Sequence, residues 1–285
     1  NLMKYYIISG EASGDLHGAN LIKALKREDP NAEFRAWGGD LMQKAGAELV
    51  KHYRDLAFMG FVEVLLNLRT ILGNIKLCQR DIVQYQPDVV ILIDYPGFNL
   101  RIAKFLKEKN IKVFYYISPQ IWAWHQSRGH KIKKVVDRMF VILPFEKDFY
   151  QKFEMQVDFV GHPLVDAIED RNQQSEHEIR TDLHLSSKPI VAILPGSRKQ
   201  EIHSMLPLML EMQQYFEEYQ FVVAAAPSQE RSFYENMIGN RRDIKIVENK
   251  TYDLLSVAEA AMVTSGTATL ETALFKVPEV VCYKG

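Results

Sequence analysis

The chain has 285 residues, of which 47% are hydrophobic and 25% charged, a composition typical of a globular protein long enough for two domains. The net charge of −1 excludes the strongly basic surface with which general nucleic-acid binders neutralise phosphates, so no nucleic acid is expected as a partner. The sequence contains no run of about 18 apolar residues and no signal segment, which predicts a cytoplasmic protein without a membrane-spanning helix.

The first predicted strand, residues 5–9, is followed by the motif G-E-A-S-G-D and then by apolar residues at helical spacing. A glycine-containing turn between a strand and a helix lets a ligand approach the backbone closely. Glu11 and Asp15 are therefore candidates to bind sugar hydroxyls, and the alternative is that Ser13 or Asp15 only caps the helix. The motif is not the G-x-G-x-x-G pattern of dinucleotide-binding domains, so a nicotinamide cofactor is not expected.

The stretch 56–77 is apolar nearly all round, whereas an amphipathic core helix shows a clear polar face. If part of it is exposed, it forms a patch for a membrane surface or an acyl chain, centred on Met59, Phe61, Val62, Leu65 and Leu66. The alternative is a helix buried between its neighbours.

Two further strands are predicted at residues 89–93 and 112–117. In open α/β sheets ligands lie beyond the carboxyl ends of the strands, so Asp94 is well placed for chemistry. After the second strand, Gln120 and Trp122 suit a sugar or acyl surface, although tryptophans that pack a loop would look the same. About six strands alternate with helices over residues 3–165, which predicts a doubly wound sheet.

The polar segment 166–188 is expected to link this domain to a second Rossmann-like domain over residues 189–285. There a strand at 189–194 runs into the turn P-G-S-R and a helix predicted over residues 200–219. Unpaired N–H groups and the dipole at a helix start bind anions. Ser197 can cap this helix, and Arg198 adds a fork of donors suited to a phosphate. An ordinary turn with a surface arginine is the plainer alternative.

A second turn of this kind follows the predicted strand 261–264. Ser265, Gly266 and Thr267 form another helix start that favours anions. Glu271 lies one turn further along the same helix face, where it can accept hydrogen bonds from the two hydroxyls of a ribose. Two such turns and a diol acceptor in one domain predict a nucleoside-diphosphate site, the alternative being helix capping beside a surface glutamate.

Eight motifs, in order along the chain, resemble those of the lipid-A-disaccharide synthases, glycosyltransferases of the GT-B type with two Rossmann-like domains. They span nearly the whole chain and lie at residues 9–15, 59–65, 93–99, 116–124, 143–147, 161–163, 194–198 and 265–271.

The resemblance implies an inverting transfer of 2,3-diacylglucosamine from UDP to 2,3-diacylglucosamine 1-phosphate, which gives lipid A disaccharide 1-phosphate and UDP. It also implies peripheral contact with the inner membrane of a Gram-negative bacterium. No metal or cofactor is implied, and the cysteines at 78 and 282 match no metal-binding spacing. In the matching motifs, the implied substrate-binding residues are Ser13, Gly14, Asn99, Gln120, Trp122, His162, Ser197, Arg198, Ser265, Gly266, Thr267 and Glu271.

The chain departs from the family pattern in two respects. Many family members carry an aspartate, the favoured general base, where this chain has Gly97, so Asp94 and Glu11 are the remaining catalytic candidates. The family also continues well past the last residue of this chain. The C-terminal domain is therefore expected to be incomplete, and a homodimer is expected only where the C-terminal tail is present.

Two other classes of protein stay open. A non-hydrolysing UDP-GlcNAc 2-epimerase, or another GT-B transferase, shares the two-domain plan but does not predict the apolar stretch before Lys76. A catalytically silent lipid- or nucleotide-binding protein is favoured by Gly97. Product analysis distinguishes these classes, because only a transferase makes a disaccharide.

Overall fold

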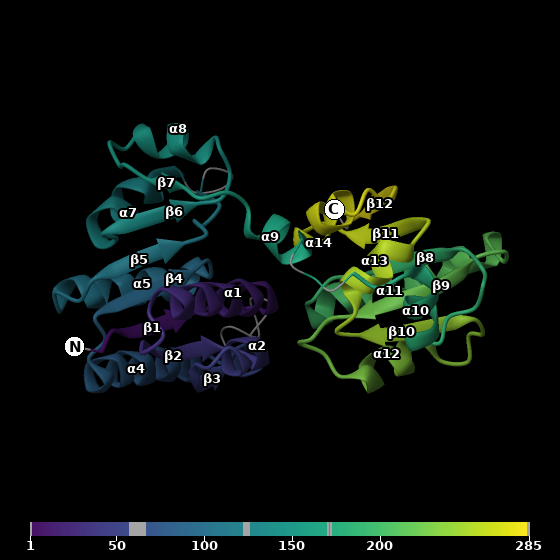
Figure 1. The fold of residues 1–285 in the computed structure, drawn as a ribbon, viewed down its shortest axis with the longest axis horizontal. Coiled ribbons are helices and arrows are strands. Elements are labelled where there is room, and N and C mark those ends of the chain that lie inside the picture. The colour runs from purple at the N-terminus through teal and green to yellow at the C-terminus, as the bar shows by residue number, and fades with distance from the viewer. Residues whose placement is uncertain (1, 57–66, 122–125, 170, 172, 284–285) are drawn as a thin grey trace. The chain divides into compact units, whose positions relative to one another are not determined.

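In a computed structural model the chain folds into two compact α/β units, residues 1–163 and 164–285 (Figure 1). The structure describes residues 2–56, 67–121, 126–169, 171 and 173–283. Each unit is built around one parallel sheet with helices along its faces, as the alternation of strands and helices predicts.

Within the described part of residues 1–163, seven parallel strands lie in the order β3-β2-β1-β4-β5-β6-β7. From β1 the chain builds outward through β2 and β3, and β4 then pairs with the other side of β1. The strand order therefore reverses between β1 and β4, the position at which doubly wound sheets bind their ligands. The strands are β1 Lys4–Ile8, β2 Glu33–Gly38, β3 Glu48–His52, β4 Val89–Ile93, β5 Val113–Tyr116, β6 Arg138–Val141 and β7 Asp158–Phe159.

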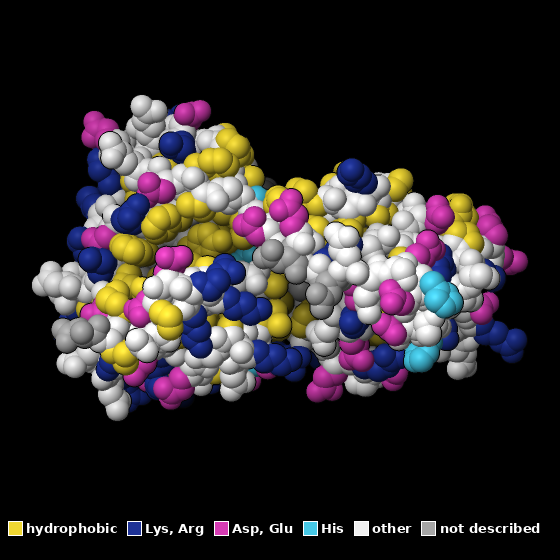
Figure 2. Space-filling view, viewed as in Figure 1, with side chains coloured by type: hydrophobic (Ala, Val, Ile, Leu, Met, Phe, Trp, Pro, Cys, Tyr) yellow, Lys and Arg dark blue, Asp and Glu magenta, His cyan; other side chains and the backbone are white. Residues whose placement is uncertain are grey.

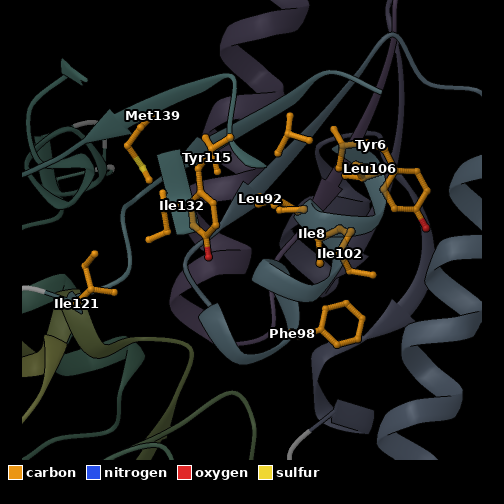
Figure 3. Close-up of a cluster of buried hydrophobic side chains, with 14 of the residues drawn as sticks. Tyr6, Ile8, Leu92, Phe98, Ile102, Leu106, Tyr115, Ile121, Ile132 and Met139 are labelled. Atoms are coloured by element: carbon orange, nitrogen blue, oxygen red, sulfur yellow. The ribbon is translucent and has the colours of Figure 1, made fainter. Parts of the chain in front are cut away.

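The central strands are apolar on both sides because both faces of the sheet are covered. Successive side chains alternate between the faces: Tyr6 and Ile8 join the core layer of α5, and Ile7 joins the layer of α1. Figure 3 shows the first layer, in which side chains of β1, β4 and β5 meet Phe98, Ile102 and Leu106. The helical segments of this unit are α1 Ala12–Glu28, α2 Asp40–Lys44, η1 Tyr53–Leu56, α4 Leu68–Tyr85, α5 Pro96–Glu108, η2 Gln126–Arg128, α7 Gly129–Val135 and α8 Glu146–Gln151.

Among the described residues of the second unit, five parallel strands lie in the order β10-β9-β8-β11-β12. Here the order reverses between β8 and β11. The C-terminal ends of these two strands are neighbours, because Leu194 pairs with Val263. The strands are β8 Ile190–Leu194, β9 Gln220–Ala225, β10 Ile244–Glu248, β11 Ala260–Thr264 and β12 Glu279–Cys282. The helical segments are α10 Glu176–Asp182, α11 Lys199–Glu211, η3 Met212–Tyr215, α12 Arg231–Ile238, α13 Thr251–Val257 and α14 Thr267–Leu274, and α9 Pro163–Glu169 begins at the boundary.

Two strands, β3 and β12, were not expected from the sequence. Both lie at an edge of their sheet and are only half-buried or exposed, so neither has the continuous apolar run that marks a central strand. The predicted helix 200–219 is also shorter than expected, because α11 ends at Glu211 and a 3₁₀ helix follows it.

The segment 166–188, expected to be a linker, contains helix α10. Ser175 caps this helix in a capping box, accepting from the backbone N–H of Glu178, whose carboxylate accepts from the N–H of Ser175 at 2.8 Å. Leu183 and Leu185 then pack against the core of the second unit. Much of this segment therefore belongs to the second unit.

None of the helices in the described ranges is long and apolar enough to cross a bilayer. The apolar patch predicted around Met59, Phe61, Val62, Leu65 and Leu66 lies outside the described residues, between η1 and α4. On the face shown in Figure 2, lysine and arginine side chains are interspersed with aspartate and glutamate over both units.

Candidate functional site

In the first unit, the two candidate bases follow the adjacent strands β1 and β4. Asp94 comes directly after β4, and Glu11 is the N-terminal cap residue of α1, three residues after β1. Glu11 is exposed and Asp94 is half-buried. The structure thus brings both carboxylates to the reversal point of the sheet, as the strand-end argument predicts.

The backbone at Asp94 is held in an uncommon conformation. Asp94 and Tyr95 have φ values of 41° and 51°, in the left-handed region that costs non-glycine residues energy and often marks functional sites. The carbonyl of Asp94 accepts hydrogen bonds from the Asn99 amide at 2.8 Å and from the Tyr115 hydroxyl at 2.5 Å. These two donors stabilise the backbone of Asp94 in this conformation.

Asn99, predicted to bind substrate, is fully buried in the structure. Its amide nitrogen lies 3.2 Å from the Ile93 carbonyl and 3.4 Å from the Ile8 carbonyl, in addition to that of Asp94. The side chain therefore ties the ends of β1 and β4 together. Its position is that of a residue that holds the candidate base in place.

The glycines of the G-E-A-S-G-D motif are required by close packing. A Cβ added at Gly10 would lie 2.4 Å from the Tyr95 ring, and one at Gly14 would lie 2.7 Å from the Cβ of Ser9. Neither position has room for a side chain. Gly14, predicted to bind substrate, is buried beside Ser9 and Ile93, whereas Ser13 is half-buried in the first turn of α1.

The carboxylate of Asp15 faces the start of helix α2. Its buried carboxylate accepts backbone N–H hydrogen bonds from Gly39 at 2.8 Å, Met42 at 3.0 Å and Leu41 at 3.1 Å. It therefore caps the short helix α2 and not the helix on which it lies. Burial raises the pKa of this carboxyl, against the effect of the three donors.

His162 approaches His17 of α1, although it follows the opposite edge strand β7. β7 lies four strands from β1, about 19 Å at the usual strand spacing. Since His162 nevertheless interacts with His17, the chain after β7 must return across the ends of the strands. His17 is buried, and its Nδ1 has no hydrogen-bond partner among the described residues. Burial, and then the nearby His162, lower the pKa of His17 to about 4, and burial also lowers the pKa of His162.

We expect His17 to make folding pH-dependent. Its pKa is about 4 in the folded chain and near 6.5 in the unfolded chain, so the unfolded chain binds more protons as the pH falls below 6.5. The resulting loss of unfolding free energy between pH 7.5 and pH 5 is about 2 kcal/mol. Urea unfolding at the two pH values should show this loss in the original chain and not in His17→Gln. An equal loss in both would contradict it, and the exposed His177→Gln is the matched control.

The remaining predicted residues of the first unit are less constrained. Gln120 is exposed, and Trp122 lies outside the described residues. Gly97 is exposed in the first turn of α5, and an added Cβ there would meet no atom within 4 Å. The structure therefore leaves room for an aspartate at this position.

In the second unit, the P-G-S-R turn is fixed by its backbone. Gly196 has a φ of 98°, a left-handed conformation that favours glycine, and it lies beside the flexible side chain of Glu201. The Ser197 carbonyl accepts hydrogen bonds from the Ser228 hydroxyl at 2.8 Å and the Gln229 amide at 3.2 Å. Arg198, exposed like Ser197, occupies the N-cap position of α11.

The second turn lies beside the first because β8 and β11 are paired. Gly266 has a φ of 153°, and its carbonyl accepts from the Thr269 hydroxyl at 2.6 Å. Ser265, Gly266 and Thr267 are exposed, and Thr267 begins helix α14. Two helix N-termini therefore meet at the reversal point of this sheet, an arrangement that favours an anion.

Glu271, one turn into α14, is half-buried. Burial raises the pKa of its carboxyl, and the facing phenol of Tyr252 partly lowers it. Tyr252 on α13 was missed by the sequence reasoning, because an aromatic residue at a helix start predicts only packing. No group of three or more potential metal ligands occurs among the described residues.

Comparison with known proteins identifies the family. The sequence model of the lipid-A-disaccharide synthetase family matches residues 5–285. The lipid-A-disaccharide synthase of Syntrophus aciditrophicus is 41% identical over 288 residues, which cover 98% of this chain and 74% of the relative. That of Coxiella burnetii is 42% identical over 283 residues, with the same coverage.

Solved structures share the fold at low sequence identity. UDP-GlcNAc 2-epimerase from Neisseria meningitidis bound to UDP-GlcNAc superposes with a TM-score of 0.69 at 12% identity, over 98% of this chain and 82% of that chain. An S. aureus MnaA–UDP structure gives 0.71 at 14% identity, over 98% and 79%. These likenesses show the two-domain α/β fold alone. The family match and the curated relatives show more: the chain belongs to the lipid-A-disaccharide synthase family, enzymes that form the lipid A disaccharide by glycosyl transfer.

Proposed function

We propose that this chain transfers 2,3-diacylglucosamine from UDP to the 6-hydroxyl of 2,3-diacylglucosamine 1-phosphate, with inversion at the transferred C1 carbon. The products are a β-1,6-linked disaccharide 1-phosphate and UDP. The observation that carries this proposal is the meeting of two helix N-termini, an exposed arginine and a half-buried glutamate where the strand order of the second unit reverses.

The second unit is proposed to bind the UDP part of the donor. N–H groups of the turns at Ser197 and Ser265–Thr267, together with the Arg198 guanidinium, bind the diphosphate. Glu271 accepts hydrogen bonds from the ribose hydroxyls. Negative charge develops on the diphosphate as the bond to C1 breaks, and prearranged donors of this kind stabilise that charge in the transition state.

The first unit is proposed to bind the acceptor and to supply the base. In a single displacement the acceptor 6-hydroxyl oxygen attacks C1, its proton passes to a carboxylate, and the bond from C1 to the UDP oxygen breaks. Asp94 is the favoured carboxylate because its backbone is held by Asn99 and Tyr115, and exposed Glu11 is the second candidate.

The acyl chains are proposed to contact the patch at Met59, Phe61, Val62, Leu65 and Leu66, which also attaches the protein to the inner membrane. One observation supports this proposal: Leu68 and Leu72, which follow the patch and lie one turn apart on the same side of α4, are 45% and 46% exposed.

An assay of the 285-residue chain with UDP-2,3-diacylglucosamine and 2,3-diacylglucosamine 1-phosphate tests the proposal. Mass analysis is expected to find the disaccharide 1-phosphate and an equal amount of UDP, and NMR to find a β linkage. A donor converted to its C2 epimer would support an epimerase instead. UDP binding without any product would support a silent binding protein, and an α linkage would contradict inversion.

A further inference from the structure

Helices α13 and α14 bring an aromatic pair together beside Glu271. The rings of Tyr252 and Phe275 are 5.5 Å apart between centroids and tilted by 44°. Phe275 follows Glu271 by one helical turn, and its N–H donates to the Glu271 carbonyl at 3.2 Å. The Tyr252 ring therefore lies against the same face of α14 from which the Glu271 carboxylate projects.

Phe275 also lies beside a charged side chain. The Arg171 guanidinium lies 4.9 Å from the centre of the Phe275 ring and 3.9 Å from the Asp253 carboxylate. Asp253 follows Tyr252 on α13, and its second oxygen lies 3.3 Å from the Lys250 ammonium. These contacts link Phe275 of α14 to Asp253 of α13, next to the Tyr252 ring.

The phenol oxygen of Tyr252 is buried and makes no well-formed hydrogen bond in the part of the chain that the structure describes. Burying a hydroxyl without a hydrogen bond destabilises the fold, so tyrosine is an unfavourable choice at this position unless its hydroxyl is used. The acidic group that faces it is Glu271. Phenylalanine would pack equally well against Phe275 without that cost.

We propose that Tyr252 is a positioning residue for the nucleotide site: its hydroxyl donates to the Glu271 carboxylate and turns it to receive the two hydroxyls of a ribose. This inference rests on the proposed role of Glu271 in binding UDP. A half-buried carboxylate gains strongly from each O–H donor, because charge-assisted hydrogen bonds are roughly twice as strong as neutral ones. With the phenol on one side, the remaining lone pairs point to the ligand.

The test combines a change in the protein with a change in the ligand. We would measure the Kd of UDP and of 2′,3′-dideoxy-UDP by calorimetry for the original chain, Tyr252→Phe and Glu271→Gln. Tyr252→Phe is expected to raise the Kd of UDP about 10-fold, or about 1.4 kcal/mol, and to change the Kd of the dideoxy ligand less than twofold. Tyr215→Phe, which removes a hydroxyl from a residue that is 68% exposed, is the matched control and should change neither Kd.

The pH dependence of UDP binding is a second readout. Protonated Glu271 accepts fewer hydrogen bonds, so the affinity falls as the pH drops through the pKa of this carboxyl. Since the phenol lowers that pKa, Tyr252→Phe should move the fall in affinity to higher pH. If Tyr252 had only a structural role, its substitution would raise the Kd of both ligands equally and would not move the pH at which the UDP affinity falls.

The outcomes separate this inference from the proposed function. If Tyr252→Phe raises the Kd of UDP and of dideoxy-UDP equally, or raises neither, while Glu271→Gln raises the Kd of UDP alone, the positioning role is wrong and the role of Glu271 stands. If Glu271→Gln also raises both Kd values equally or neither, Glu271 does not bind the ribose, and both the assignment and the inference are overturned. If the original chain does not bind UDP, the nucleotide site itself is wrong.

Discussion

Replacing Asp94 with asparagine is expected to lower kcat for disaccharide formation by about 10²–10⁴-fold and to leave the Kd of UDP within about twofold. An amide cannot take the proton of the acceptor hydroxyl. Asparagine is also the residue that, after glycine, best tolerates a positive φ, so the backbone at 41° should persist with its bonds from Asn99 and Tyr115. Steady-state kinetics with both substrates measure kcat, and calorimetry measures the Kd of UDP.

Glu11→Gln is the matched variant for this prediction. If Asp94→Asn keeps more than a tenth of the activity while Glu11→Gln abolishes it, Glu11 is the base and Asp94 is not. Gly97→Asp is a third variant, which tests whether an aspartate at this position can act as the base. An aspartate fits in the open first turn of α5 and is favoured there by the helix dipole. In the Asp94→Asn background it should restore part of the transfer, as the family pattern implies.

Replacing Arg198 with alanine is expected to weaken UDP binding by about 10²-fold, which corresponds to about 2.7 kcal/mol. The guanidinium would supply two parallel charge-assisted hydrogen bonds to the diphosphate, and alanine supplies none. Transfer should fall further still, because charge on the leaving diphosphate increases in the transition state. The melting temperature should not change, since the side chain is exposed at the N-cap position of α11.

The conservative variant Arg198→Lys distinguishes charge from geometry. It keeps the positive charge and loses the planar fork of donors, so an intermediate loss of UDP affinity is expected. Isothermal calorimetry at low and high salt measures both variants, and the difference between original chain and Arg198→Ala should shrink as salt rises. Unchanged UDP affinity in Arg198→Ala would remove this residue from the phosphate site.

The sequence by itself determined the fold class, because buried parallel strands leave long aliphatic runs and turns require glycine. The central strands β1, β4, β8 and β11 were predicted within a residue or two for this reason. The edge strands β3 and β12 left no such signal, since only one neighbour and part of one face cover them. The turns at Gly196 and Gly266 were predicted from the same local logic.

The sequence also determined which strand ends carry polar residues, but only the tertiary structure decided which of those residues face outward. Asp15 and Asn99 were predicted to bind ligands from their places in the motifs, and the structure adds that Asp15 caps α2 from 24 positions away and that Asn99 reaches the carbonyl of Ile8 across 91 positions. Such contacts depend on how elements distant in the chain pack against one another. The role proposed for Tyr252 also depends on tertiary structure, because its hydroxyl faces Glu271 of α14 only once α13 packs beside that helix. Local sequence patterns reflect the residue preferences of a single strand, turn or helix. The hydrogen-bond partner of a buried polar group is instead determined by the packing of the whole unit.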